Sequence, residues 1–183
     1  MLVIPMSNMT AWPTAYWIDA VATFGSVYFG VTFAYSRGEN ADTTDVTEQL
    51  ATGGLDWSPT LIMFNEDRAL WVGTLKSGNT TTGFGNGLAN AYFYQVKGGF
   101  KPTDKLDIMA SVAFATADTT PANYVSKNYG YEVDVTGTYK ITNNLYSMLG
   151  AGYLITGDYF KGTDSNNKVA NNYIVINKLT LTF

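Results

Sequence analysis

Residues 173–183, the last eleven of this 183-residue chain, alternate between bulky apolar side chains and mostly polar ones. Successive side chains of a β-strand point to opposite faces. One face of this segment therefore carries Tyr173, Val175, Leu179, Leu181 and Phe183, and the other carries Lys178, Thr180 and Thr182. A terminal strand of this kind is typical of a membrane β-barrel, whose last strand must complete the wall within lipid.

Six further segments repeat this alternation, at residues 15–24, 27–36, 88–100, 105–116, 129–140 and 144–156. Each is close to the 9–11 residues with which a tilted strand crosses a bilayer. Together with residues 172–183 they predict seven strands. Their connections alternate between short turns and long polar stretches, the longest being residues 37–86. This asymmetry favours short periplasmic turns and long extracellular loops.

We therefore predict an all-β fold: an antiparallel up-and-down transmembrane β-barrel, or the C-terminal part of a larger one, with residues 1–183 as one barrel unit. Bacterial single-chain barrels have an even number of strands, so seven strands leave one unaccounted for. Either residues 2–6 belong to an eighth strand, or further strands precede Met1 in the natural protein. The start lacks the basic region and long apolar core of a signal peptide, so we expect a mature or C-terminal piece.

The composition fits a membrane barrel better than a soluble one. Charged residues make up 14% of the chain and aromatic residues 15%, whereas about 25% of residues are charged in ordinary globular proteins. A soluble barrel or sandwich with its bulky face inward is the alternative. Its solvated face would carry many Lys and Glu, whereas the polar faces here consist mainly of Gly, Ala, Ser and Thr.

Several function classes are disfavoured by what the chain lacks. It has no Cys and no His, which removes thiolate chemistry and the commonest general base and metal ligand. We expect no metal, no cofactor and no enzymatic activity, although Glu132 and Asp134 lie two residues apart on one face. The net charge of −4 and the absence of a Lys/Arg cluster argue against a nucleic-acid partner.

Two parts of the chain resemble large porins, including alginate-export-like porins: residues 15–39 (AYWIDAVATFGSVYFGVTFAYSRGE) and residues 129–160 (YGYEVDVTGTYKITNNLYSMLGAGYLITGDYF). The last strand is similar to the terminal signal of Gram-negative outer-membrane proteins. In this resemblance Tyr173, Leu179, Leu181 and Phe183 form the signal that the outer-membrane assembly machinery reads. The chain lacks the many Arg and Lys that line alginate-type pores, so alginate is not predicted as its solute.

If the bulky face meets lipid, the opposite face lines a lumen. Its ionisable members are Asp19, Lys97, Asp107, Glu132, Asp134, Lys140 and Lys178. They predict a polar, mildly acidic conduit that biases the passage of solutes electrostatically. The alternative for Lys97 and Asp107 is that they pair across neighbouring strands and stabilise the sheet.

Residues 37–86 form the second candidate site, because a loop this long is usually functional or disordered. We expect its second half to fold inward or across the mouth. The anchors would be Trp57, Phe64 and Trp71, and the residues near a constriction would be Asp56, Glu66, Asp67 and Arg68. The alternative is a capping loop that packs for stability alone.

The sequence thus predicts a porin, an integral protein of a Gram-negative outer membrane, through which small hydrophilic solutes diffuse passively. The alternative is a non-conducting outer-membrane barrel with a structural, adhesion or scaffold role. Expected partners are outer-membrane lipid and lipopolysaccharide, the assembly machinery and the solutes. A homo-oligomer or an association with a missing N-terminal barrel segment is compatible with the same pattern.

Overall fold

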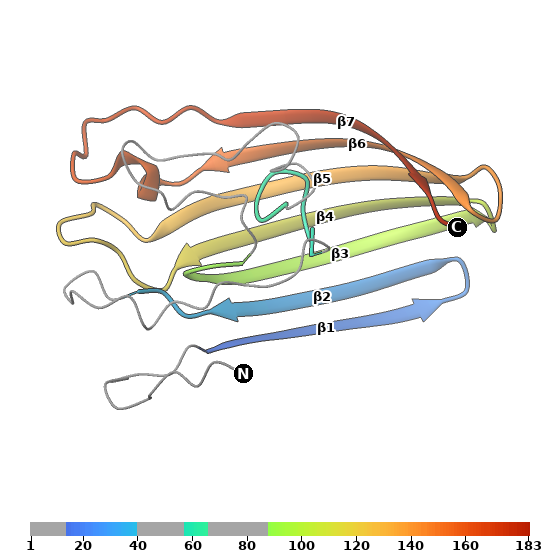
Figure 1. Cartoon of the computed structure of the whole chain (residues 1–183), viewed down its shortest axis with the longest axis horizontal. Helices are drawn as coiled ribbons and strands as arrows, with labels where there is room; N and C mark the ends of the chain where they lie inside the picture. Colours follow the sequence, from blue (N-terminus) through green and yellow to red (C-terminus); the bar gives the residue numbers. More distant parts are fainter. Residues whose placement is uncertain (1–13, 40–56, 66–87) are drawn as a thin grey trace, which may run out of the picture.

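The structure, a computed structural model, describes residues 14–39, 57–65 and 88–183 of the chain. It contains one antiparallel sheet of seven strands in the order β1-β2-β3-β4-β5-β6-β7 (Figure 1). The strands are β1 (Ala15–Phe24), β2 (Val27–Ser36), β3 (Ala91–Thr103), β4 (Leu106–Ala117), β5 (Asn128–Lys140), β6 (Leu145–Thr156) and β7 (Asn172–Leu181). A short 3-10 helix, η1 (Asp158–Lys161), precedes β7.

The fold is therefore all-β, with an up-and-down order in which every strand pairs with its neighbours in sequence. β1 and β7 are the two edges of the sheet, and in the described part of the chain they do not pair with each other. Because the strands alternate in direction and their number is odd, β1 and β7 run the same way. The sheet is open rather than closed into a barrel.

The two faces of the sheet differ as the alternation predicts. Val31, Val96, Val112 and Val133 are successive register partners across β2 to β5, and all four are exposed. Their neighbours in sequence point the other way, where Thr32, Gln95, Ala113 and Glu132 are register partners and are buried. We call the valine side the outer face and the opposite side the inner face.

A row of aromatic rings crosses the outer face. Ring centroids of Tyr16 and Phe33 lie 5.8 Å apart, those of Phe33 and Tyr94 5.1 Å, and those of Tyr94 and Phe114 6.2 Å. The row continues from Phe114 to Tyr131 at 4.7 Å. It therefore runs from β1 to β5 at one height on the sheet.

The connections differ in length between the two ends of the sheet (Figure 1). At one end β1 and β2 are joined by Gly25 and Ser26, and Gly25 takes the positive φ of 61° that this tight turn requires. At the other end β3 begins at Ala91 rather than at residue 88. There the Asn90 side chain is engaged with Thr119, accepting from its N–H at 2.8 Å and donating to its carbonyl at 2.9 Å.

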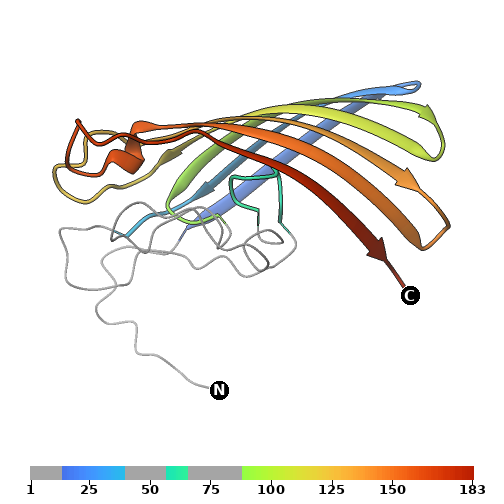
Figure 2. The same cartoon turned by 90° about the horizontal axis from the view of Figure 1, so that it is seen from above.

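Residues 57–65, which we call the inner segment, lie against the inner face (Figure 2). Ile62, Met63 and Phe64 of this segment join Phe93 and Leu154 of the sheet in one buried cluster. The core of the described structure is therefore built between the sheet and a segment from the long β2–β3 connection.

Candidate functional site on the inner face

The inner segment forms a compact turn that aims its backbone N–H groups at the sheet. The Thr60 hydroxyl donates to the Met63 carbonyl, and the Asn65 Nδ2 donates to the Thr60 carbonyl at 2.6 Å. Phe64 adopts a positive φ of 51°, which is uncommon for a bulky residue. These features bring three successive N–H groups, those of residues 61, 62 and 63, to one side of the turn.

Two carboxylates of β5 accept those three N–H groups. Ile62 and Met63 donate to the two oxygens of Glu132 at 2.6 and 2.7 Å, and Leu61 donates to Asp134 Oδ2 at 3.1 Å. Glu132 is 0% exposed and Asp134 is 2% exposed. Consecutive backbone N–H groups form a concave anion-binding surface, and hydrogen bonds to a charged acceptor are the stronger kind.

Gln95 on β3 provides a third attachment. Its Nε2 donates to the Pro59 carbonyl at 2.7 Å and to Ser111 Oγ at 3.2 Å. We call Gln95, Glu132 and Asp134 the docking residues, because their side chains bind the backbone of the inner segment. Binding through the backbone fixes the position of the segment with little dependence on its side chains.

Two glycines of β6 leave the space that the segment occupies. A Cβ atom added at Gly150 would lie 2.9 Å from Leu61 Cδ1. One added at Gly152 would lie 2.5 Å from Asp134 Oδ1 and 3.2 Å from Leu61 Cβ. Because the two glycines have no side chain, the Leu61 side chain and the Asp134 carboxyl group fit against β6.

Aromatic contacts complete the attachment of the inner segment. The ring of Trp57 lies 5.5 Å from that of Phe93, and the ring of Phe64 lies 5.8 Å from Phe93 and 6.3 Å from Tyr129. Tyr129 in turn donates to the Asn90 carbonyl at 3.1 Å. Two of the three expected anchors thus lie against the sheet, whereas Trp71 lies outside the described residues.

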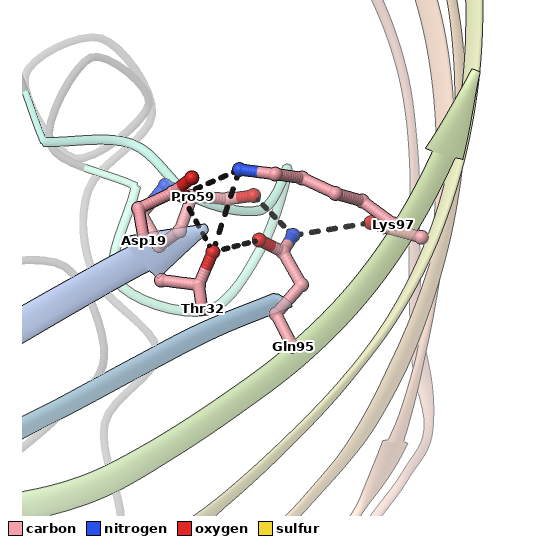
Figure 3. Close-up of polar contacts among 6 residues, drawn as sticks. Asp19, Thr32, Pro59, Gln95 and Lys97 are labelled. Carbon is pink, nitrogen blue, oxygen red and sulfur yellow. Dashed lines mark hydrogen bonds and ion pairs between the residues drawn. The ribbon is translucent and has the colours of Figure 1, made fainter. Parts of the chain in front are cut away.

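A second polar cluster lies beside the docking residues, towards the β1 edge (Figure 3). Lys97 Nζ on β3 contacts Asp19 Oδ2 on β1 at 2.5 Å, and the Thr32 hydroxyl of β2 donates to the same oxygen at 2.8 Å. Gly30 lies between them on β2, where an added Cβ would be 2.8 Å from Lys97 Cε. The lysine side chain therefore crosses the sheet over a glycine.

The alternative pairing of Lys97 with Asp107 is wrong. The register places Lys97 opposite Ser111, and it shifts between Phe100 and Thr103. Asp107 instead lies 3.7 Å from Lys101 Nζ and accepts from the Tyr28 hydroxyl at 2.9 Å. In this register Asp107 lies four positions away from the partner of Lys97, and the gap above Gly30 lets the lysine side chain reach Asp19 instead.

The remaining predicted lumen residues share the inner face by register. Lys140 is opposite Tyr146, and Lys178 is opposite Met148. On the outer face Tyr173, Leu179, Leu181 and Phe183 are all exposed. Asp56, Glu66, Asp67 and Arg68 lie outside the described residues, as Trp71 does, so their predicted place at a constriction stays a prediction.

A cavity of about 200 Å³ remains between the inner segment and the sheet. Its lining includes Ser58 and Leu61 of the segment, Met109 and Met148 of the sheet, and Asp134. Two oxygens of these lining residues, Ser58 Oγ and Asp134 Oδ1, are buried without a hydrogen-bond partner. Among the residues that the structure describes, no group of three or more His, Cys, Asp or Glu is arranged to hold a metal ion.

The docking role of Gln95, Glu132 and Asp134 was missed by the sequence reasoning, which assigned the two carboxylates to solute contact. One signal was present: two acidic residues and one amide on faces made mainly of Gly, Ala, Ser and Thr. A buried polar group needs a partner, and the long connection at residues 37–86 was the nearest unassigned source of donors.

Comparison with family models, with curated proteins and with solved structures gives no match. In the described ranges no helix has the length and apolar character to cross a membrane.

Proposed function

We propose that this chain forms part of the wall and the internal constriction of an outer-membrane porin, through which small hydrophilic solutes diffuse. One observation carries the proposal: the bulky apolar face is exposed, while the polar face is buried where the inner segment covers it. Val133 is 45% exposed and Leu181 is 58% exposed. Asp134 follows Val133 in the sequence but points to the other face, and it is only 2% exposed. An apolar surface of this extent marks a site of interaction with another phase or protein.

Two features support lipid as that phase. The strands are 10 to 13 residues long, enough for a tilted strand to span the hydrocarbon layer. The aromatic row from Tyr16 to Tyr131 is the kind of girdle that forms where rings lie at the level of the lipid headgroups. Short turns at one end and longer connections at the other agree with periplasmic and extracellular sides.

Closure into a barrel is part of the proposal. β1 and β7 run the same way, so antiparallel closure requires an odd number of further strands between these two edges. Those strands would come from another chain or from residues outside the described ranges, where residues 2–6 are the expected eighth strand. A barrel of about 14–18 strands encloses an aqueous channel, whereas eight strands enclose mostly side chains.

The inner segment would narrow such a channel. Its three N–H contacts to Glu132 and Asp134 hold it against one side of the lumen. The Lys97–Asp19 pair beside the inner segment places charges of both signs on the lining, which would bias small charged solutes.

A non-conducting barrel is the second candidate, and one observation favours it. Phe93 and Met63 are 0% exposed beneath the inner segment, as in the filled interior of a small barrel. Such a protein would have a structural, adhesion or scaffold role.

Planar-bilayer recording on the purified full chain separates the two candidates. A porin gives discrete current steps that scale with salt concentration, and a filled barrel that inserts gives none. Flotation of the protein with lipid vesicles is the control for insertion. A protein that floats with vesicles and shows no current at any voltage would remove the pore and retain the structural role.

A further inference from the structure

Glu132 and Asp134 form a pair of neighbouring carboxyl groups beneath the inner segment. They lie two residues apart on the inner face of β5, and both are buried. The two side chains are hydrogen-bonded to each other, and such a bond requires a proton on one of them, since ionised carboxylates only accept. Asp134 Oδ1 is buried and no other described group donates to it. The shared proton therefore also supplies the donor that a buried oxygen needs.

Within the described residues no basic side chain takes the place of this proton. The residues opposite the pair are uncharged: Ser111 and Ala113 on β4, and Gly152 and Leu154 on β6. The inner segment, residues 57–65, has no titratable side chain, and Lys97 of β3 pairs with Asp19. Lys178 of β7 lines the neighbouring cavity, but the ion pairs of the described residues do not join it to either carboxyl group.

Loss of the shared proton would place two negative charges side by side in this buried site. Like charges at this spacing repel each other, and burial disfavours a charge that has no counterion. The N–H groups of residues 61–63 donate to the pair, but they carry only partial positive charge. Once the inner segment is detached, water solvates both carboxylates. The docked state therefore depends on the shared proton, whereas the detached state does not.

We propose that the inner segment is a pH-sensitive element: it docks while Glu132 and Asp134 share a proton, and it detaches when the pair loses that proton. Because the proton stabilises only the docked state, docking is strongest at low pH and weakens as the pH rises. One linked proton changes the docking equilibrium by up to about tenfold per pH unit. The biological meaning rests on the proposed function: in a pore, a rise in pH would release the segment from β5 and widen the channel.

Amide hydrogen exchange of residues 62 and 63 measures detachment, and Asp134→Asn isolates the contribution of the proton. In this variant the asparagine oxygen accepts from the Leu61 N–H, and its NH₂ group donates to Glu132. The variant therefore keeps the hydrogen bond between the two side chains at every pH, without a proton that can be lost. The full chain in non-ionic detergent is measured between about pH 6 and pH 9. Each rate is divided by the rate of the same amide in Asp134→Asn at the same pH, which cancels the pH dependence of the exchange chemistry.

We expect this ratio to rise at least about tenfold across the range, because only the wild-type pair has a shared proton to lose. Asp107→Asn is the matched control: this inner-face carboxyl group has Tyr28 and Lys101 as its partners, so the variant should retain the wild-type rise. Glu132→Gln is a second reference, for use if Asp134→Asn does not fold. It also lacks the shared proton, so the wild-type rates should rise with pH relative to its rates in the same way.

A ratio that stays constant or falls as the pH rises would overturn the inference, because docking would then not depend on the proton. Loss of the pH dependence in Asp107→Asn would overturn it as well, because the titrating group would then lie elsewhere on the inner face. Exchange is measured without any conductance, so the result is independent of the bilayer recording. A rising ratio without current would leave the pH-sensitive segment and remove the pore, and current with a constant ratio would do the reverse.

Discussion

Replacing Glu132 with glutamine tests whether this carboxylate holds the inner segment in place. Glu132 accepts two backbone N–H groups, from Ile62 at 2.6 Å and from Met63 at 2.7 Å. Glutamine keeps one acceptor oxygen and places an NH₂ group against the other N–H. One hydrogen bond survives, and one buried N–H loses its acceptor.

The size of the effect follows from these two losses. A hydrogen bond between neutral groups contributes about 0.5–1.5 kcal/mol, and a buried donor without a partner costs about 1–3 kcal/mol. Allowing for local rearrangement, we expect the docked segment to lose about 2–3 kcal/mol relative to its open state. A tenfold change corresponds to about 1.4 kcal/mol, so opening becomes roughly 30- to 150-fold more frequent.

Amide hydrogen exchange of residues 61–63 in purified, detergent-solubilised protein measures this opening. Exchange at these amides should accelerate by that factor in Glu132→Gln. The matched control is Asp107→Asn, which removes an inner-face carboxylate whose recorded partners are Tyr28 and Lys101. Unchanged or slower exchange in Glu132→Gln would refute the reasoning. It would mean that burying the Glu132 carboxyl group costs more free energy than its hydrogen bonds to residues 62 and 63 return.

Three further predictions concern packing, the outer face and charge. Gly150→Ala places a Cβ 2.9 Å from Leu61 Cδ1, so we expect a loss of about 1–3 kcal/mol in unfolding free energy. A Cβ added at Gly137 would have no atom within 4 Å, so Gly137→Ala should leave the unfolding free energy unchanged or raise it by up to about 1 kcal/mol. Equal effects of the two substitutions in denaturant titrations would contradict the contact between Gly150 and Leu61. If the outer face meets lipid, Val112→Arg should cost about 2–4 kcal/mol in vesicles, whereas Thr138→Arg on the inner face should cost much less; similar costs would count against a lipid-facing surface. Lys97→Glu leaves the inner face more acidic, so the reversal potential of the proposed pore under a salt gradient should move towards greater cation preference, and no movement would place this residue away from the ion path.

Much of the fold follows from the period-two alternation alone. In β2, Phe29 and Val31 on one side and Thr32 and Ala34 on the other are assigned to faces by counting, and the structure places them on those faces. The number and antiparallel order of the strands follow from the same count and from the short turns. The exact ends do not, because the start of β3 depends on the contact of Asn90 with Thr119, residues 29 apart in sequence.

The site was less accessible to sequence reasoning because its contacts join distant parts of the chain. The choice of Asp19 as the partner of Lys97 depends on the gap above Gly30 and on the register of three strands. The docking of residues 61–63 on Glu132 and Asp134 joins backbone groups, which carry no sequence signature. Acidic residues on an otherwise small-residue face indicated that something binds there, but not that the binder was the chain itself.

The hydrogen bonds of the inner segment also impose an order of assembly. They connect residues 69, 70 and 73 positions apart, whereas the hairpins β3–β4 and β5–β6 close over only a few residues. Short-range pairing is the faster process, so β5 presents Glu132 and Asp134 to water before residues 57–65 arrive. Dehydration of the two carboxylates is then coupled to the last docking step. A molecule in which residues 57–65 have not docked would keep Glu132 and Asp134 exposed to water on the inner face. This exposed acidic surface distinguishes a partly folded molecule from the native one.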